Sequence, residues 1–333
     1  MMLTGLLGVA IELPSALWFQ LVLIVVGVIL VLWGADRLTD GAVALAERAR
    51  IPQIVIGLTI VALGTSAPEF CVSLVSALKG TADLAVGNVV GSNIFNTMLI
   101  VGAAAMVAPM TILPSTVRKD IPVTILSSVA LAVMVLIDGN ISYLDAAILF
   151  VGFLAFMWIT LRGAKGSHAI EQEQAASKGY SVLKAIGMLS LGLVCLIVGS
   201  NFFVDGATKV AEALNVSEAV IGLTIVAGGT SLPELATSIV AARKGNSGIA
   251  IGNVLGSNVM NILLILGGAG LICPMTVNGI TAIDLMVLVV SIFLLWLFSR
   301  TRYTVERWEG GVLTLLFLGY MAWLVLSVTQ VQG

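Results

Sequence analysis

The sequence contains very few charged residues. Sixteen Lys and Arg and eighteen Asp and Glu make up 10% of its 333 residues, whereas 59% are hydrophobic and the mean hydropathy is +1.11. Soluble domains carry about 25% charged residues, so this composition excludes a water-soluble globular protein. A net charge of −2 and a pI of about 5.4 provide no basic surface for nucleic acid. We therefore expect a protein that crosses the membrane several times.

Residues that bind transition metals or form disulfides are also scarce. The single histidine, His168, lies in a polar stretch, where we expect an ordinary solvated loop residue. The three cysteines, Cys71, Cys195 and Cys273, are too far apart to suggest a disulfide framework or a Cys-x-x-Cys metal motif. The sequence offers no embedded Ser–His pair and no Gly-x-Gly-Asp motif for an intramembrane protease. We expect no enzymatic activity and no bound cofactor.

Ten apolar stretches are long enough to cross a membrane as helices, which takes about 20 residues each. They lie at residues 17–35, 52–78, 83–107, 121–137, 142–161, 182–202, 217–242, 248–271, 282–299 and 309–328. The predicted fold class is an all-α polytopic membrane protein with ten transmembrane helices. The first twelve residues lack a basic segment and a cleavage site, so we expect a short leader into the first span and not a secretory signal.

The positions of Lys and Arg predict the orientation of these spans, because cytoplasmic loops are enriched in both residues. With the N-terminus outside, fourteen of the sixteen basic residues fall in cytoplasmic segments, and Lys79 and Lys209 fall outside. Both termini are then outside, and the polar stretch at 162–181 is a cytoplasmic linker. The compact length favours a bacterial or archaeal inner membrane.

The chain repeats itself with an offset of 165 residues. Residues 51–80 match 216–245 at 18 of 30 positions, and residues 85–102 match 250–267 at 11 of 18. The predicted units are a first half at 1–161, the linker at 162–181 and a second half at 182–333. Because each half has five spans, an odd number, the second half enters the membrane from the opposite side. Inverted repeats are typical of secondary transporters, which bind their substrate at mid-membrane between the repeats.

Each repeat carries a polar motif near the middle of a span, GTSAPE ending at Glu69 and GTSLPE ending at Glu234. A carboxylate at that depth costs about 2.5–3.5 kcal/mol on insertion scales, so both glutamates are candidate functional residues. The proline of each motif cannot donate to the carbonyl four residues before it, which predicts a broken helix. We expect the break to turn backbone carbonyls toward a ligand, those of Ala62 and Ala227 among them.

A second duplicated motif reads GNVVGSNIFN at 87–96 and GNVLGSNVMN at 252–261. The serine and the last asparagine of each motif are four residues apart, so they share one helical face. The candidate ligands from this motif are Ser92, Asn96, Ser257 and Asn261. Asn88 and Asn253 lie on the same faces, either as further ligands or as hydrogen-bonding residues between helices; the sequence leaves both interpretations open.

All of these groups offer oxygen atoms, which suit Ca²⁺, Na⁺ or Mg²⁺ and not Zn²⁺ or Cu⁺. A cage of flexible oxygens fits the six-to-eight coordination of Ca²⁺ better than the hydrated octahedron of Mg²⁺. Two glutamates balance one Ca²⁺, whereas three Na⁺ leave one excess positive charge. Exchange of three Na⁺ for one Ca²⁺ would therefore depend on voltage, by about 2.3 kcal/mol per charge per 100 mV. An empty cage with two negative charges is hard to return across the membrane, which favours obligatory exchange over a channel.

The duplicated GTSxPE and GNVxGSN motifs, one set in each half, resemble the α-repeats of the calcium/cation antiporter superfamily and most resemble its sodium/calcium exchanger family. The resemblance covers essentially the whole chain. It implies Na⁺/Ca²⁺ antiport by alternating access, with four ion sites in a central cluster and with spans 1 and 6 sliding across a rigid core. The ligands it implies are Thr65, Ser66, Glu69, Ser92 and Asn96, then Thr230, Ser231, Glu234, Ser257 and Asn261, with carbonyls of Ala62 and Ala227. Its partners are Ca²⁺, Na⁺ and membrane lipid, with no obligate protein partner.

The chain departs from the family pattern at Asn261, where many prokaryotic and K⁺-dependent relatives carry Asp. With Asn at both 96 and 261, only the two glutamates are charged, so we expect exchange without K⁺ and a cluster less sensitive to protonation. The alternative is H⁺/Ca²⁺ antiport, although that branch typically has GNAxE-like motifs. The linker is too short for a regulatory Ca²⁺-binding domain, so we expect no cytoplasmic regulation by Ca²⁺.

Overall fold

The computed structural model describes residues 17–164, 180–214, 225 and 227–331. Eight of its helices are long and apolar enough to cross a membrane, and a pair of helices joined at a bend is a ninth candidate. These nine match nine of the ten predicted spans. The remaining prediction, 217–242, begins on residues outside those described. The prediction of a helical membrane protein is confirmed.

Short elements alternate with long helices along the chain. Before the linker they are α2 (Leu17–Ala49), α3 (Gln53–Ile56), the π-helical η1 (Gly57–Val61), α4 (Ala62–Thr65), α5 (Ala67–Leu78), α6 (Ala82–Ile94), the π-helical η2 (Phe95–Ile100), α7 (Val101–Val107), β1 (Met110–Thr111), α8 (Pro114–Arg118), α9 (Asp120–Asp138), β2 (Asn140–Ile141) and α10 (Tyr143–Ala164). After it they are α11 (Val182–Ala213), α13 (Ala227–Thr230), α14 (Leu232–Arg243), α15 (Ser247–Val259), the π-helical η4 (Met260–Leu266), α16 (Gly267–Ile272), β3 (Met275–Thr276), α17 (Ala282–Arg300), β4 (Thr304–Val305) and α18 (Arg307–Val331).

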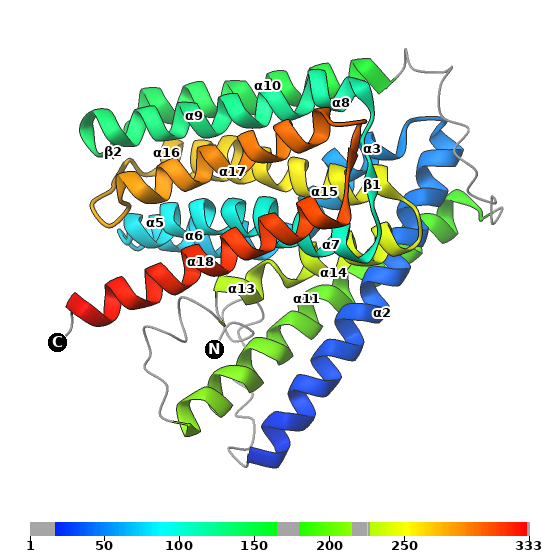
Figure 1. Ribbon diagram of the computed structural model, residues 1–333, viewed down its shortest axis with the longest axis horizontal. Helices are drawn as coiled ribbons and strands as arrows, with labels where there is room; N and C mark the ends of the chain where they lie inside the picture. The colour runs from blue at the N-terminus through cyan, green and yellow to red at the C-terminus, as the bar shows by residue number, and fades with distance from the viewer. Residues whose placement is uncertain (1–16, 165–179, 215–224, 226, 332–333) are drawn as a thin grey trace.

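Helices α2 and α11 are much longer than a membrane requires. They have 33 and 32 residues, so each is about 50 Å long at 1.5 Å per residue, against a hydrocarbon core of about 30 Å. Each is a single helix that continues well beyond the predicted span, to Ala49 and to Ala213. Figure 1 shows the two helices side by side, crossing the direction of the other long helices at an oblique angle.

The contact between α2 and α11 consists largely of glycines seven residues apart. These are Gly27, Gly34 and Gly41 on α2 and Gly192, Gly199 and Gly206 on α11. A methyl group added at Gly27 would lie 2.7 Å from the carbonyl oxygen of Gly199, and one at Gly192 would lie 2.7 Å from that of Gly34. The two backbones therefore touch, in antiparallel directions. In lipid, close packing of small residues is a main source of helix association.

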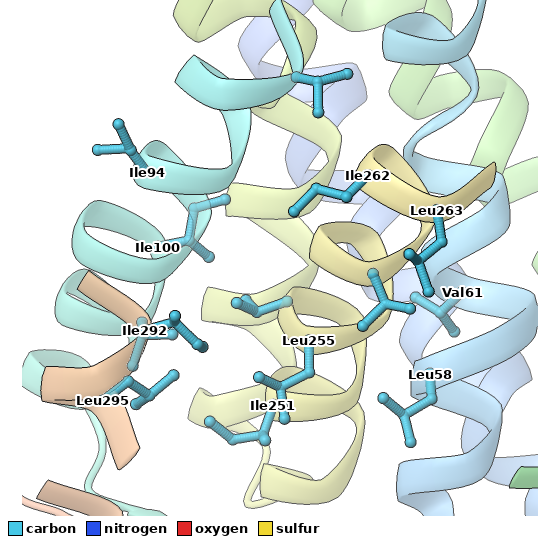
Figure 2. Close-up of a cluster of buried hydrophobic side chains, with 14 of the residues drawn as sticks. Leu58, Val61, Ile94, Ile100, Ile251, Leu255, Ile262, Leu263, Ile292 and Leu295 are labelled. Carbon is cyan, nitrogen blue, oxygen red and sulfur yellow. The ribbon is translucent and has the colours of Figure 1, made fainter. Parts of the chain in front are cut away.

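The remaining long helices form a packed core around α15 and η4, which are almost completely buried. Figure 2 shows Leu58 and Val61 of η1 facing Leu255 of α15 and Leu263 of η4. Glycines let these backbones approach as well, because a methyl group at Gly252 would lie 2.7 Å from the carbonyl oxygen of Ile54. The core thus holds the interrupted helices between well-packed neighbours.

Two small β-pairings link segments from before and after the linker. Strand β1 pairs with β4, and β2 pairs with β3, both antiparallel. Met110–Thr111 and Met275–Thr276 are equivalent under the 165-residue offset. The labels β1 and β2 lie at opposite ends of the helix bundle in Figure 1. Each end of the bundle therefore has a contact between the two repeats.

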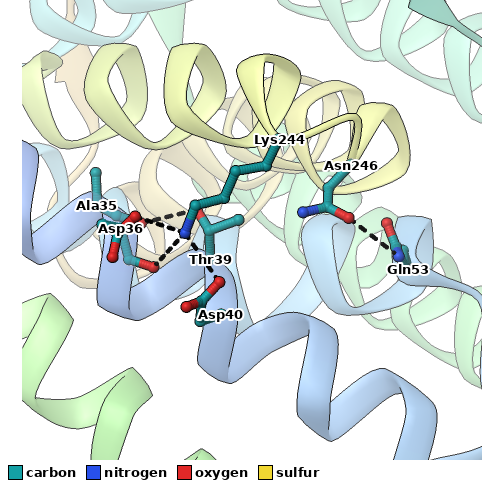
Figure 3. Close-up of polar contacts among 7 residues, drawn as sticks. All are labelled: Ala35, Asp36, Thr39, Asp40, Gln53, Lys244 and Asn246. Atoms are coloured by element: carbon teal, nitrogen blue, oxygen red, sulfur yellow. Dashed lines mark hydrogen bonds and ion pairs between the residues drawn. The ribbon is translucent and has the colours of Figure 1, made fainter. Parts of the chain in front are cut away.

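A polar cluster connects α2 to the end of α14 (Figure 3). The ammonium Nζ of Lys244 lies 2.6 Å from Oδ1 of Asp36 and 2.9 Å from Oδ1 of Asp40. Nearby, the Gln53 side-chain amide donates to Oδ1 of Asn246 at 3.4 Å. Partly exposed ion pairs contribute about 0–1 kcal/mol, so this cluster joins α2 to the core but adds little to the stability of the fold.

The glycine contact between α2 and α11 predicts a sharp difference between two positions on α11. Gly192→Ala places a methyl group 2.6 Å from the backbone nitrogen of Leu38, whereas Gly187→Ala meets no described atom within 4 Å. We expect Gly192→Ala to lower the melting temperature of the purified protein in detergent. Gly187→Ala is expected to leave it unchanged or to raise it, because Ala is about 1 kcal/mol more favourable than Gly within a helix. Equal melting temperatures for the two variants would contradict the close packing.

Candidate ion-binding site

The first polar motif lies at a break between two helices. Helix α4 ends at Thr65 and α5 begins at Ala67, and the segments on either side are bent by 51°. Ser66 lies at the break with ψ of 8°, and its counterpart Ser231 between α13 and α14 has the same ψ. Pro68 occupies the first turn of α5, where no backbone N–H is needed for the helix. The predicted break is confirmed.

Because the chain breaks at Ser66 and again at Ser231, each glutamate lies in the first turn of the helix that follows. Glu69 is in the first turn of α5 and Glu234 in the first turn of α14. Helix N-termini carry a partial positive charge of about half an elementary charge, which stabilises a nearby carboxylate. Both side chains are 0% exposed. Two buried carboxylates are thus held at the ends of two half-helices.

The break does not free the carbonyl of Ala62 as expected. The backbone N–H of Ser66 donates to it at 2.9 Å, as in a regular helix, and the Thr65 hydroxyl lies 3.4 Å from the same oxygen. The kink begins only after Thr65, so the Ala62 carbonyl keeps its helical hydrogen bond. A carbonyl oxygen has a second lone pair, so Ala62 keeps the capacity to bind a ligand. Ala227 is the first residue of α13.

The serines of the two motifs bond to the glutamates of the opposite repeat. The Ser66 hydroxyl donates to Oε1 of Glu234 at 3.0 Å, and the Ser231 hydroxyl donates to Oε1 of Glu69 at 3.0 Å. The Ser257 hydroxyl donates to Oε1 of Glu234 at 3.4 Å. The two breaks therefore face each other, and their polar groups form one cluster.

The threonines follow the same crosswise pattern. Thr230 interacts with the Glu69 carboxylate, and Thr65 interacts with that of Glu234. The hydroxyl of Thr65 also donates to Oδ1 of Asn253 at 2.9 Å. Ser92 is buried in α6, at 4% exposure. All ten predicted side chains are buried residues of the core.

Four oxygen atoms of this cluster are buried and receive no hydrogen bond from the described residues. They are Oε2 of Glu69, Oε2 of Glu234, Oδ1 of Asn96 and Oδ1 of Asn261. They form two pairs that the 165-residue offset relates. Buried polar atoms are normally hydrogen-bonded, and a buried carboxylate without a partner is strongly unfavourable. Four acceptors without donors are the arrangement that a cation satisfies.

Asn96 and Asn261 lie on two of the π-helical segments, η2 and η4. Their amide nitrogens donate hydrogen bonds to two further asparagines. Asn96 donates to Oδ1 of Asn258 at 3.1 Å, and Asn261 donates to Oδ1 of Asn93 at 3.0 Å. Asn93 and Asn258 were not among the predicted ligands, although both belong to the duplicated GSN motif. Their equivalence under the repeat was the signal that could have identified them.

Asn88 and Asn253 join helices. The amide of Asn88 donates to the Ser73 hydroxyl at 2.9 Å, and that of Asn253 donates to the Ser238 hydroxyl at 3.0 Å. Each amide also lies 3.3 Å from the backbone carbonyl of the glutamate in its own repeat. Of the two interpretations that the sequence left open, the contacts support hydrogen bonding between helices.

The two glutamates lack a basic partner: in the part of the chain that the structure describes, no Lys or Arg forms an ion pair with either of them. The same residues contain no group of three His, Cys, Asp or Glu that could hold a metal ion. Neutral amide and hydroxyl oxygens must therefore complete any coordination shell. That donor set suits Na⁺ and Ca²⁺.

The fold agrees with a comparison against known protein families. The sequence profile of the family described as "Sodium/calcium exchanger protein" matches residues 19–162 and 184–326. The chain belongs to this family, a branch of the calcium/cation antiporters, and it is a multi-pass membrane transporter.

Similar proteins cover nearly the whole chain. The inner membrane protein YrbG of Escherichia coli K12 is 39% identical over 316 residues, which cover 91% of this chain and 95% of that protein. The sodium/calcium exchanger MaX1 of Methanosarcina acetivorans is 30% identical, covering 90% and 96%. A solved structure of the sodium-calcium exchanger NCX_Mj, soaked with Na⁺ and Sr²⁺, superposes with a TM-score of 0.80 at 33% identity, covering 91% of this chain and 97% of that one.

The crosswise hydrogen bonds predict that two serines from different repeats are equivalent. Ser66→Ala and Ser231→Ala each remove one oxygen and one hydrogen bond to a buried carboxylate. We expect each to weaken Ca²⁺ binding by about tenfold, the effect of losing one bond to a charged group, and the two losses to agree within about threefold. Equilibrium ⁴⁵Ca²⁺ binding to the purified protein measures this.

Ser128→Ala is the matched control for the two serine variants. Ser128 is equally buried, but its hydroxyl bonds to the carbonyl of Thr124 within α9. This variant should bind Ca²⁺ like the unmodified protein. A tenfold loss in only one of the two site variants would contradict a shared cluster.

Proposed function

We propose that the protein is a secondary antiporter that exchanges Na⁺ for Ca²⁺ by alternating access, without K⁺ and with three Na⁺ for each Ca²⁺. The observation that carries this proposal is the set of four buried oxygens that receive no hydrogen bond from the described residues. Two of them belong to carboxylates whose charges one Ca²⁺ neutralises. Membership of the sodium/calcium exchanger family supports Ca²⁺ as a transported ion.

The proposed ligands are the residues of the two polar motifs and the two GSN motifs. They are Thr65, Ser66, Glu69, Ser92 and Asn96, then Thr230, Ser231, Glu234, Ser257 and Asn261, with the carbonyls of Ala62 and Ala227. Contacts of Ser66, Ser231 and Ser257 with the glutamates support this set. One Ca²⁺ leaves the cluster neutral, and three Na⁺ leave it with one positive charge. Exchange therefore moves net charge across the membrane.

The proposed architecture is two inverted halves of five spans, at residues 1–161 and 182–333, joined by a cytoplasmic linker at 162–181. The two equivalent serine–glutamate bonds between the repeats support it, as do the strand pairs at opposite ends of the bundle. In such an arrangement the same motif approaches the ions from either side of the membrane. That is a natural basis for access that alternates between the two sides.

We also propose that both termini lie outside the cell membrane. Four cation–π contacts support this orientation, since each pairs a basic residue from a predicted cytoplasmic segment with an aromatic ring. They are Arg37 over Trp33, Arg162 over Trp158, Lys184 over Tyr180 and Arg300 over Trp296. Aromatic residues concentrate at membrane interfaces, and Lys and Arg on the cytoplasmic side.

Helices α2 and α11 are the proposed moving part. Their backbones touch each other along a line of glycines, which makes them one rigid pair. Their length forces an oblique path across the bundle, and partly exposed polar contacts such as the Lys244 cluster join α2 to the core. A pair of helices that is packed this closely is suited to move as one unit.

Proteoliposomes loaded with Na⁺ test the coupling. We expect an outward Na⁺ gradient to drive ⁴⁵Ca²⁺ uptake. With three Na⁺ leaving for each Ca²⁺ that enters, one positive charge leaves the vesicle, so a positive interior should accelerate uptake and a negative interior should slow it. Glu69→Gln and Glu234→Gln should each abolish uptake, because Ca²⁺ then meets one charge in place of two.

The same vesicles separate Na⁺ from H⁺ as the coupling ion. Uptake that proceeds equally well on a pH gradient in the absence of Na⁺ would refute the proposal and support H⁺/Ca²⁺ antiport. Glu47→Gln, at an exposed position near the end of α2, is a control for the loss of one negative charge and should transport normally.

Replacing all K⁺ by choline on both sides of the membrane tests the role of K⁺. With amides at 96 and 261, the cluster carries no third carboxylate that would balance a co-transported K⁺. We expect the initial rate of Na⁺-driven ⁴⁵Ca²⁺ uptake to be the same with and without K⁺. Loss of uptake on removal of K⁺ would show that K⁺ is required.

A further inference from the structure

Asparagine side chains can face a site with either of two chemically opposite ends. The Oδ1 end accepts hydrogen bonds and binds cations, and the Nδ2 end donates hydrogen bonds and repels cations. Asn96 and Asn261 are useful to a cation only with Oδ1 turned toward it. The orientation of a buried amide depends on whether its neighbours donate or accept hydrogen bonds. In this cluster a backbone carbonyl, which can only accept, determines it.

The Asn93 amide nitrogen donates to the backbone carbonyl of Asn258 at 3.0 Å. A carbonyl oxygen can only accept, so Asn93 must place its Nδ2 there. Its Oδ1 then points to Asn261, whose Nδ2 donates to it at 3.0 Å. The Oδ1 of Asn261 is left over, and it is one of the four oxygens that receive no hydrogen bond from the described residues. The backbone thus fixes the polarity of Asn261 through Asn93.

The contacts of the other repeat differ in one respect, because the partner of the Asn258 amide is a hydroxyl, which can donate as well as accept and does not fix the orientation of that amide. Asn258 donates through Nδ2 to the Thr97 hydroxyl at 2.8 Å and accepts from Asn96 at 3.1 Å. Within the described chain, Oδ1 of Asn96 is again left without a donor. All four asparagines are at most 1% exposed, so bulk water offers no alternative partner. We call these four residues, Asn93, Asn96, Asn258 and Asn261, the amide lock.

We propose that Asn93 is a positioning residue that fixes the orientation of Asn261, so that Asn261 presents oxygen to the ion. The inference rests on the proposed cation site. Without Asn93, the amide of Asn261 is free to turn over and direct its Nδ2 to where its Oδ1 now lies. An amide nitrogen that reaches a carboxylate forms a charge-assisted hydrogen bond, and such bonds are strong. The protein's own amide would then compete with the cation.

The amide lock also selects the residue type at 261. Asn93 presents an acceptor to this position and cannot turn, because its Nδ2 is held by the Asn258 carbonyl. An ionised Asp at 261 would place its second oxygen against that acceptor, whereas an amide supplies the donor that is needed. An amide at position 261 therefore supplies the donor that Oδ1 of Asn93 requires, and a carboxylate does not.

The test uses the difference between an amide and a carboxylate. A carboxylate presents oxygen whichever way it turns, so loss of Asn93 should be harmful only while residue 261 is Asn. We expect Asn93→Ser to weaken equilibrium ⁴⁵Ca²⁺ binding to the purified full-length protein by about tenfold or more, the minimum for a competing charge-assisted hydrogen bond. In an Asn261→Asp background, the same substitution should not weaken binding. Serine both donates and accepts, so it cannot dictate the orientation of the amide.

Asn88→Ser is the matched control, because Asn88 is on the same helix and its described hydrogen bonds go to Glu69 and Ser73. Its effect should be the same in both backgrounds. An equal loss from Asn93→Ser in both backgrounds would mean that Asn93 is merely structural and would overturn the proposal. Asn93→Thr, whose hydroxyl also donates and accepts, tests the same point in both backgrounds if Asn93→Ser does not fold.

Failure of the amide lock is distinct from failure of the proposed function. If the unmodified protein binds Ca²⁺ and the two backgrounds respond equally, the cation site stands and the amide lock does not exist. If the unmodified protein binds no Ca²⁺ at any Na⁺ concentration, both fall.

Discussion

The constraint on which the rest of the structure depends is the burial of two glutamates without a counter-charge. Glu69 and Glu234 are both 0% exposed, and their Oε2 atoms receive no hydrogen bond from the described residues. Several features reduce the free-energy cost of burying these carboxylates. Both lie in the first turn of a helix, and serines of the opposite repeat donate hydrogen bonds to them. None of these neutralises two charges. A bound cation neutralises them, and the neutral oxygens of the site complete its coordination.

The duplication of the sequence determines how these features are arranged. Each repeat supplies a carboxylate to one half of the cluster and a serine to the other, so neither repeat forms a complete site alone. The same offset of 165 residues relates the glycines of α2 to those of α11. Each repeat therefore contributes the same set of residues to the ion site and the same set of glycines to the contact between α2 and α11.

Much of this could be predicted from the sequence, for identifiable physical reasons. Apolar runs of about 20 residues are long enough to cross a membrane, so the spans could be predicted. Pro68 cannot donate the next helical hydrogen bond, so the break could be predicted as well. The extent of the break was not predictable, because the bond from Ser66 to the Ala62 carbonyl depends on where the chain begins to bend. Periodicity places Ser92 and Asn96 on one face but does not identify a partner on another helix. The role of Asn93 and Asn258 emerges only when α6 and α15 are brought together.

The most direct measurement is the location of the ion. Crystals grown with Ca²⁺ replaced by Sr²⁺, recorded near the strontium absorption edge, would reveal a heavy cation by its anomalous scattering. We predict one strong peak bounded by Oε2 of Glu69 and Glu234, with oxygen distances of about 2.3–2.6 Å for Ca²⁺ itself and slightly longer for Sr²⁺. High Na⁺ should remove this peak. A peak elsewhere in the bundle, or none between the two glutamates at saturating Sr²⁺, would contradict the central role of the two carboxylates.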